Sequence, residues 1–325
     1  MYYVIYGNSN GFYDIAYKDI VDLPNVEYYR GICFENKFLN FILRIHLSKK
    51  VNGIIELPFK KCWYKLLYYN IKKKPKDEDK LCFLFFSRLI EDDFSRNYLL
   101  YLKDRFPRAK YVCYFHDILD SHININIENI KEIFDLVLTY DYNDSIKYNL
   151  IYHPTPYCFV SIEKNKKYES DIYFVGKAKT RMQTIVSAYD KFEQKGFKCL
   201  FFIVDCNLKE YPIRNGIRYI ETMSYIENLK YVRNSKCVLE INQEGAIGMT
   251  PRTWEAIMYD KYLITNNIYI KNTPFFVGKY MKIYCDNIDI DLDLNKNISY
   301  PCKLKLLLSP INLINKIEYN FLHSY

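Results

Sequence analysis

Apolar runs alternate with amphipathic segments along the first half of the chain. Four runs are mostly apolar and have the length of buried strands: residues 2–6, 81–86, 110–115 and 135–139. Residues 94–105 and 127–134 repeat apolar positions every three or four residues, which is typical of amphipathic helices. Strands that alternate with helices predict a parallel sheet with crossover connections.

The alternation restarts after residue 156. The expected strands are residues 171–175, 198–204, 216–220, 237–241 and 262–265, with helices at 180–195, from 225 and from 250. The segment His153-Pro154-Thr155-Pro156 cannot continue a helix and is predicted to be a hinge. A chain of 325 residues is long enough for two cores. We therefore expect an α/β protein with two Rossmann-like domains, residues 1–155 and 156–302, that face an interdomain cleft.

Residues 303–325 form a final helical pattern, which is predicted to pack back on the first domain.

Half of the residues are hydrophobic, and this composition excludes a disordered chain. Ten cysteines occur without any C-x-x-C pair, so neither a zinc ribbon nor a dithiol redox motif is present. The N-terminus lacks a basic region, and no apolar run has the length of a membrane span. These features predict a cytoplasmic location.

Residues 37–80 carry the whole net charge of +8, because they hold twelve Lys or Arg and four acidic residues. Within them, residues 59–69 interleave lysines with large aromatic residues. This pattern is typical of an interfacial helix on an anionic membrane, and equally of a solvated basic helix whose aromatic residues face the core. No RNA- or DNA-recognition motif accompanies the segment, so nucleic acid is not an expected partner.

The segment 240–256 combines a strand end, a glycine-containing loop that includes Gly248, and a helix start. Thr250 is a good N-cap and is followed by proline and Arg252, so the helix end and the arginine favour an anion. Glu244 and Glu255 flank this turn. Because carboxylates repel phosphate, their expected partners are the hydroxyls of a sugar and a ribose, and the segment predicts a nucleotide-sugar site.

A second anion site is predicted where the strand at 171–175 ends. Gly176 is followed by Lys177, Lys179 and Arg181 at the start of the next helix. Cations at a helix N-terminus oppose the helix dipole unless an anion neutralises them. The alternative is a solvated basic turn. The segment is not a P-loop, because the second glycine and the Gly-Lys-Ser/Thr ending are absent.

His116 and Asp117 directly follow the strand at 110–115. They are expected at the carboxyl edge of the first sheet, where ligands bind in open α/β sheets. Either side chain is a candidate base or acceptor contact, and a helix-capping aspartate is the alternative. Arg88 and residues 7–11 occupy equivalent strand ends and rank below them.

Several segments together resemble a known family. They are Ser224-Tyr225 with Leu229, residues 235–241, Gly248-Met249-Thr250 with Arg252, Glu255-Ala256, and residues 261–267. This run resembles the donor half of bacterial GT-B glycosyltransferases of lipopolysaccharide and capsular polysaccharide biosynthesis, over about residues 171–270. The N-terminal half is similar at Tyr114-Phe115-His116-Asp117, Phe134-Asp135 and Asp141.

The resemblance implies that the C-terminal domain holds the nucleotide, that Glu255 bonds the ribose, and that catalysis needs no metal. It predicts transfer of a sugar from a nucleoside diphosphate donor, UDP-sugar first among them, to a surface-polysaccharide or lipid-linked oligosaccharide acceptor. Glu244 and Glu255 are eleven positions apart. This spacing is wider than that of the two glutamates in the retaining enzymes of the largest related group, so the anomeric outcome stays open.

Two other functions stay open at this point. A polyol-phosphate or phosphosugar transferase of similar fold would carry paired basic and histidine motifs, and an inactive membrane-attached scaffold would bind no nucleotide. Asp289 and Asp291 form the Asp-x-Asp pattern of metal-dependent glycosyltransferases. The pattern follows the predicted nucleotide unit instead of a central strand, so a solvated acidic turn is expected there and no metal site is predicted.

Overall fold

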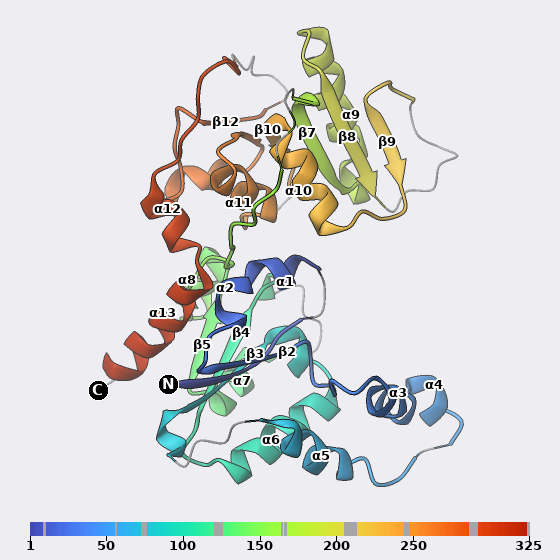
Figure 1. Ribbon diagram of the computed structural model, residues 1–325, viewed down its shortest axis with the longest axis vertical. Coiled ribbons are helices and arrows are strands. Elements are labelled where there is room, and N and C mark those ends of the chain that lie inside the picture. The colour runs from blue at the N-terminus through green and yellow to red at the C-terminus, as the bar shows by residue number, and fades with distance from the viewer. Residues whose placement is uncertain are drawn as a thin grey trace. The chain divides into compact units, whose positions relative to one another are not determined.

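The chain forms two compact units, Met1–Thr155 with Leu313–Tyr325, and Pro156–Asn312. The computed structural model describes residues 1–8, 11–55, 57–72, 77–119, 126–163, 165, 168–204, 213–243, 247–285 and 292–323, apart from the side chain at position 49. Each unit is built on one sheet with helices packed against it (Figure 1).

The first sheet has six strands, and every neighbouring pair is parallel. In order across the sheet they are β2 (Val26–Tyr29), β1 (Tyr2–Tyr6), β3 (Leu81–Phe86), β4 (Lys110–Phe115), β5 (Leu136–Thr139) and β6 (Ile151–Tyr152). Parallel strands need crossover connections, which the intervening helices supply.

In the described part of the first unit, four helices begin at polar caps that the sequence provides. The side chains of Asn36, Asp92, Asn126 and Asp141 each accept a backbone N–H of the helix that follows. The helical segments are α1 (Gly11–Ala16), α2 (Lys18–Val21), α3 (Lys37–His46), α4 (Lys49–Asn52), α5 (Cys62–Asn70), η1 (Glu78–Lys80), η2 (Ser87–Ile90), α6 (Asp93–Arg105), α7 (Ile127–Ile133) and α8 (Tyr142–Lys147).

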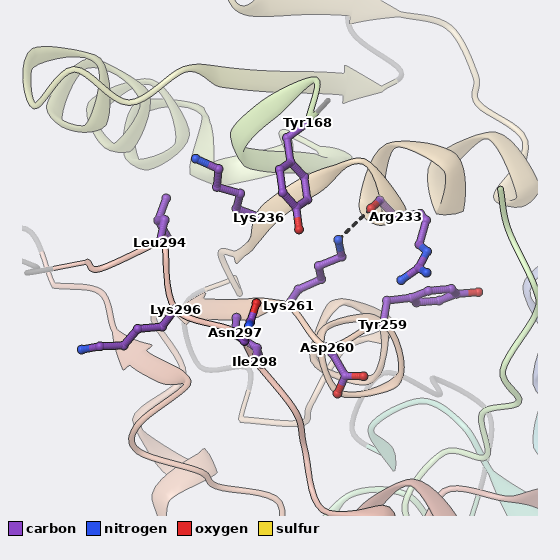
Figure 2. A pocket seen from close by; sticks show the side chains of 10 residues that line it. All are labelled: Tyr168, Arg233, Lys236, Tyr259, Asp260, Lys261, Leu294, Lys296, Asn297 and Ile298. Carbon is purple, nitrogen blue, oxygen red and sulfur yellow. Dashed lines mark hydrogen bonds between the residues drawn. The ribbon is translucent and has the colours of Figure 1, made fainter. Parts of the chain in front are cut away.

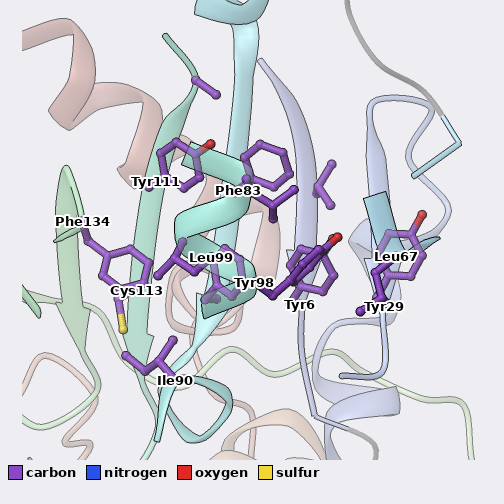
Figure 3. Packing of buried hydrophobic residues seen from close by; sticks show 14 of the residues in the cluster. Tyr6, Tyr29, Leu67, Phe83, Ile90, Tyr98, Leu99, Tyr111, Cys113 and Phe134 are labelled. Atoms are coloured by element: carbon purple, nitrogen blue, oxygen red, sulfur yellow. The ribbon is translucent and has the colours of Figure 1, made fainter. Parts of the chain in front are cut away.

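Both faces of the first sheet are buried, which explains the nearly continuous apolar runs of its strands. Alternate residues of β3 enter two different clusters, Phe83 and Phe85 on one face and Leu84 and Phe86 on the other. Figure 3 shows the first cluster, in which Phe83 packs among side chains of the neighbouring strands and of α6. Because the two faces carry aromatic side chains, the sheet is closed to solvent on both sides.

The second sheet also has six parallel strands. In order across it they are β12 (Met281–Ile283), β11 (Tyr262–Thr265), β10 (Ser235–Glu240), β7 (Ser170–Lys177), β8 (Cys199–Val204) and β9 (Ile217–Ile220). The helical segments of this unit are η4 (Lys179–Arg181), α9 (Met182–Gln194), α10 (Tyr225–Arg233), α11 (Pro251–Met258), η5 (Ile268–Asn272) and α12 (Cys302–Leu307).

The prediction of an α/β protein with two Rossmann-like domains is confirmed by these two sheets. The capped starts at Ser224 and Thr250 are confirmed as well, because each side chain accepts a backbone N–H of α10 or α11. The sequence pattern did not indicate β2, β6 and β12, each of which lies at the edge of a sheet. Edge strands are short and partly exposed, so they lack the apolar runs of central strands.

The last helix, α13 (Pro310–His323), confirms the helical pattern at the end of the chain and packs on the first sheet from Leu313 onward. Leu313 and Ile317 are completely buried in the cluster that contains Tyr3. The Glu318 carboxylate lies 3.0 Å from the N-terminal amine and accepts the Tyr3 hydroxyl at 3.2 Å. The two ends of the chain are therefore joined in one core.

We expect Ile317→Ala to destabilise the first unit by about 2–5 kcal/mol, because it removes a buried side chain from this core. Ile311→Ala is the matched control on the same helix, since Ile311 is 42% exposed. Hydrogen exchange of the strand amides measures the effect separately in each sheet, and faster exchange is expected only in the first sheet of Ile317→Ala. Equal protection in both variants would show that α13 does not hold the unit together.

Candidate functional site

The second sheet has one point at which the strand order reverses, between β7 and β10. From β7 the chain first moves outward through β8 and β9, and then returns to build β10, β11 and β12 on the other side. This order is the one used by dinucleotide-binding domains, in which ligands bind outside the carboxyl ends of the strands at the reversal. Gly176 and Lys177 end β7, and Glu240 ends β10. The predicted anion-binding segments therefore meet at the reversal.

Two arginines lie across this edge of the sheet. The Nε and Nη2 groups of Arg181 donate to the Lys177 carbonyl at 3.2 and 2.9 Å, and Nη1 donates to the Ile241 carbonyl. The Nε and Nη2 groups of Arg252 donate to the Val175 carbonyl at 3.1 and 2.6 Å. Arg181 thus links the ends of β7 and β10, and Arg252 links β7 to α11.

The electrostatics of this edge favour an anion. Burial, and after it the charge of Arg252, lower the pKa of Arg181 to about 10, while the charge of Glu240 opposes this shift. Within the described ranges, neither arginine has a carboxylate within ion-pair distance, and the groups that accept from them are backbone carbonyls. A bound phosphate would relieve the repulsion between the two guanidinium groups, because it brings negative charge and accepts hydrogen bonds from a guanidinium in bidentate fashion.

Gly176 makes room for the Arg181 guanidinium. A Cβ at position 176 would lie 3.2 Å from Nη2 of Arg181, so a larger residue would crowd it. Lys177 and Lys179 are exposed on the same turn. Lys179 has a φ of 47°, a left-handed conformation that is costly for a residue with a side chain. The turn is therefore held in an unusual conformation directly beside the two arginines.

The buried carboxylate of Glu240 accepts hydrogen bonds from the N-terminal residues of α11. Oε1 of Glu240 accepts the Thr250 N–H at 3.2 Å and the hydroxyls of Thr250 and Thr253 at 2.6 and 2.9 Å. Oε2 accepts the Thr265 hydroxyl at 2.6 Å. The Arg252 N–H donates to the Thr250 hydroxyl. The first N–H groups of the helix are thus already used, which differs from the sequence-based expectation that they are free for phosphate.

The loop before α11 is fixed by side-chain amides. Nδ2 of Asn242 donates to the Gly248 carbonyl at 3.1 Å, and Nδ2 of Asn267 donates to the Ile247 carbonyl at 2.8 Å. Gly248 is therefore held next to the ends of β10 and β11. At the start of α11 the N–H groups of Thr250 and Arg252 are engaged, so the guanidinium groups are the charged donors that the described part of this edge offers to a ligand.

Glu255 lies one turn further along α11 and is completely buried. Its Oε1 accepts the Tyr225 hydroxyl at 2.7 Å and the Asn228 amide at 2.9 Å. Its Oε2 has no hydrogen-bond partner among the described residues. Burial raises the pKa of this carboxyl, and the charge of Arg252 opposes the shift. One oxygen of Glu255 is anchored and the other can still accept a donor.

The structure separates His116 from Asp117. His116 is buried among aromatic rings, its Nε2 lies 2.6 Å from the Tyr17 hydroxyl, and burial lowers its pKa to about 3. Asp117 is partly exposed and pairs with Arg88, with 2.7 Å between Oδ2 and Nε. The carboxylate therefore lies at the open edge of the first sheet, whereas the imidazole is part of the core.

Glu244 and the aspartates at positions 289 and 291 lie outside the described residues. In the part of the chain that the structure describes, no group of three His, Cys, Asp or Glu side chains is arranged to hold a metal ion. Glu240 was missed by sequence reasoning. Its signal is an acid at the end of an apolar strand, followed by three threonines that all donate to it.

The first unit has a cavity of about 360 Å³ at the carboxyl ends of β1 and β2. Gly7 and Asn8 line it from the end of β1, and Arg30 and Arg44 add positive charge. A Cβ at Gly7 would lie 2.1 Å from the Tyr28 hydroxyl, so this position needs glycine. The strand order of the first sheet reverses beside it, between β1 and β3. This is a second ligand-sized space at a strand-order reversal.

Next to this cavity, residues 37–72 expose both apolar and basic side chains. Phe38 and Phe41 of α3 are 69% and 61% exposed, and Phe59 is 78% exposed. In α5, by contrast, Trp63, Tyr64 and Leu67 face the core. No helix among the described residues has the length and apolarity that a membrane span requires. The aromatic residues of this segment are therefore divided between the core and the surface.

Neither a protein-family model nor a curated protein matches the chain. Solved structures that are similar in fold include three glycosyltransferases. An α-glucosyltransferase in complex with UDP and a 13-mer DNA has 10% identity and a TM-score of 0.47, and the match covers 84% of this chain and 83% of that one. A glycotransferase of kitacinnamycin has 8% identity and a TM-score of 0.48, with 98% of both chains covered.

The third is the glycosyltransferase SnogD from Streptomyces nogalater, with 8% identity, a TM-score of 0.35 and 81% of both chains covered. All three are glycosyltransferases by name. At such identities and TM-scores a likeness of fold does not assign an activity, because one fold hosts many chemistries.

We expect Glu255→Gln to gain stability relative to the wild type as pH rises from about 4 towards neutrality. Because burial raises the pKa of Glu255, the unfolded chain loses this proton first, and the folded wild type loses stability above the unfolded pKa of about 4.3. Urea unfolding at several pH values measures the difference. Glu227→Gln on the exposed face of α10 is the control, and a difference that does not change with pH would contradict this expectation.

Proposed function

We propose that the chain transfers a sugar from a nucleoside diphosphate donor, UDP-sugar first among them, to a surface-polysaccharide or lipid-linked oligosaccharide acceptor. The observation that carries this proposal is the pair Arg181 and Arg252 at the strand-order reversal of the second sheet. Both guanidinium groups are held rigidly by carbonyls, and within the described ranges neither has an acidic partner. A diphosphate is the ligand whose charge and geometry suit two such cations.

Departure of the nucleoside diphosphate requires that negative charge be stabilised as it develops on the leaving group. In this proposal Arg181 and Arg252 supply that charge from fixed positions, and Lys177 and Lys179 add mobile cations from the adjacent turn. Gly176 keeps the space for Arg181, while Gly248 and Thr250 belong to the fixed loop before α11. Four cations can provide the counter-charge of a divalent ion, so we propose a metal-independent reaction.

Glu255 is proposed to bind the ribose. Its Oε2 lacks a partner, and a ribose hydroxyl would supply the missing donor. Because Glu255 has no exposed surface, this contact requires that the carboxylate or its covering side chains move when the donor binds. Glu244 is the proposed contact to the transferred sugar. Before the donor binds, the hydrogen bonds from Tyr225 and Asn228 keep the Glu255 carboxylate oriented.

The first unit, residues 1–155, is proposed to bind the acceptor, and residues 156–302 to bind the donor. Asp117 is partly exposed at a strand end and is the preferred base or acceptor contact there, whereas His116 is buried with Nε2 engaged. The cavity beside Gly7 offers two arginines and apolar walls, which suits an acceptor that carries phosphate and lipid. The exposed apolar and basic side chains of residues 37–72 would then lie on the anionic inner leaflet of the plasma membrane.

We expect Lys177→Ala and Arg181→Ala each to weaken UDP binding by about tenfold or more, because each removes a charge-assisted contact to phosphate. Lys198→Ala and Arg218→Ala remove exposed cations elsewhere in the same unit and serve as controls. Titration calorimetry with UDP measures the affinity. Release of UDP from UDP-sugars should persist in excess EDTA.

Three outcomes would contradict this proposal. Loss of activity in EDTA with rescue by manganese would show that a metal holds the diphosphate. Failure of the wild type to bind any nucleotide would favour a scaffold role. Turnover of a cytidine diphosphate polyol in place of nucleotide-sugars would identify a polyol-phosphate transferase.

We expect Phe38→Ser with Phe41→Ser to reduce sedimentation with vesicles of phosphatidylglycerol, because these exposed rings would enter the interface. Replacing the exposed residues Lys50, Lys61 and Lys65 with Gln should reduce binding by about fivefold per lysine, and only on anionic vesicles. Replacing Lys195 and Lys198 of the second unit with Gln is the control. Equal binding to phosphatidylcholine and phosphatidylglycerol would count against electrostatic docking.

A further inference from the structure

A second polar cavity, of about 200 Å³, lies in the second unit where β10 and β11 begin. Its walls come from Tyr168, from Arg233 at the end of α10, from Lys236 in β10, from residues 259–261 between α11 and β11, and from residues 294 and 296–298. The arginine pair described above lies where the same strands end, so the two places are at opposite edges of the sheet. The proposed function does not use this cavity.

The charge on the cavity wall is mostly positive. Four cationic side chains line it, Arg233, Lys236, Lys261 and Lys296, and the acidic side chain in the lining is Asp260. Asp260 is paired with Lys305 at 2.8 Å, Lys236 with Asp171 at 2.8 Å, and Lys296 with Asp293 at 3.1 Å. Within the described ranges Arg233 has no carboxylate within ion-pair distance, so these pairs leave its charge unbalanced. A cavity with this balance attracts an anion.

Lys261 and Arg233 form the inner wall. Lys261 is only 3% exposed, and its Nζ donates to the carbonyls of Arg233 and Ser235 at 2.7 and 2.6 Å. These bonds close the C-terminal end of α10 and explain why a lysine is buried there. They do not account for Arg233, whose Nε is buried and has no hydrogen-bond partner among the described residues.

Polar groups surround the same space. Figure 2 shows the Tyr168 hydroxyl on one side of the Lys261 chain and the Arg233 guanidinium on the other, with Asn297 below. Lys261 Nζ lies 5.2 Å from the centre of the Tyr168 ring. A guanidinium, an ammonium, a phenol and an amide can all donate to the oxygens of one tetrahedral anion.

We propose that this cavity binds a phosphate group, either as inorganic phosphate or as the monophosphate of a small metabolite. The volume is below the roughly 300–1,000 Å³ of pockets that enclose larger ligands, so a whole nucleotide does not fit. The ligand accepts from the Arg233 guanidinium, which lines the cavity, and balances its charge. The site is separate from the donor site and independent of the proposed sugar transfer.

Calorimetry with inorganic phosphate and with glucose 6-phosphate, at constant ionic strength, tests the site. We expect Arg233→Gln to weaken phosphate binding by about tenfold or more, because a charge-assisted contact is lost. Arg218→Gln removes an exposed cation elsewhere in the same unit and should leave this binding unchanged. Asn297→Asp places a negative charge on an exposed position of the wall and should have the same effect as Arg233→Gln without disturbing the fold.

The two ligands distinguish the source of the phosphate. Tighter binding of glucose 6-phosphate identifies a phosphate ester, and tighter or equal binding of inorganic phosphate identifies the free anion. Either result, with loss in Arg233→Gln and Asn297→Asp, supports the site. No binding at millimolar concentration, or binding that is kept in both cavity variants, would overturn it.

Discussion

The carboxylate of Glu240 joins three elements of the second unit. It ends β10, accepts four hydrogen bonds, and thereby fixes the first turn of α11 and the end of β11. A buried carboxylate is tolerated only when its oxygens are satisfied, and three threonines and a backbone N–H do this here. The position of Arg252 follows from this arrangement, because Arg252 is the second residue of the helix that Glu240 anchors.

The carboxyl edge of the second sheet is therefore layered by charge. Glu240 lies inside and uses the donors of the helix start, and its charge favours the charged form of Arg181. Arg181 and Arg252 lie above it and are held by the carbonyls that the ends of β7 and β10 leave unpaired. Among the residues that the structure describes, this layering fixes two cations without pairing them to an acid, which is the state that the proposed phosphate-binding edge requires before its ligand arrives.

The two units use their sheets differently. In the first sheet aromatic residues cover both faces, and His116 is buried among them. The polar and charged groups that remain accessible are Asp117, the lining of the cavity beside Gly7, and the surface of α3. In the second sheet the charged residues lie at both ends of β10, with Glu240 at one end and the wall that contains Lys261 at the other. A single strand thus connects the proposed donor edge with the cationic cavity.

The sequence by itself determined the α/β class, the central strands and the capped helix starts, because these depend on local periodicity and on residues three positions apart. It also indicated Gly176, Lys177, Arg181 and Arg252 as a basic group near strand ends. It did not indicate three of the edge strands, β2, β6 and β12, whose few residues carry too weak a pattern. Only the tertiary structure decided that Arg181 and Arg252 meet at a strand-order reversal and that His116 is buried. It alone also showed that the Thr250 N–H donates to Glu240 and the Arg252 N–H to the Thr250 hydroxyl, so these groups are not free for phosphate. Each of these depends on side chains far apart in the chain, and a local pattern carries no information about such distances.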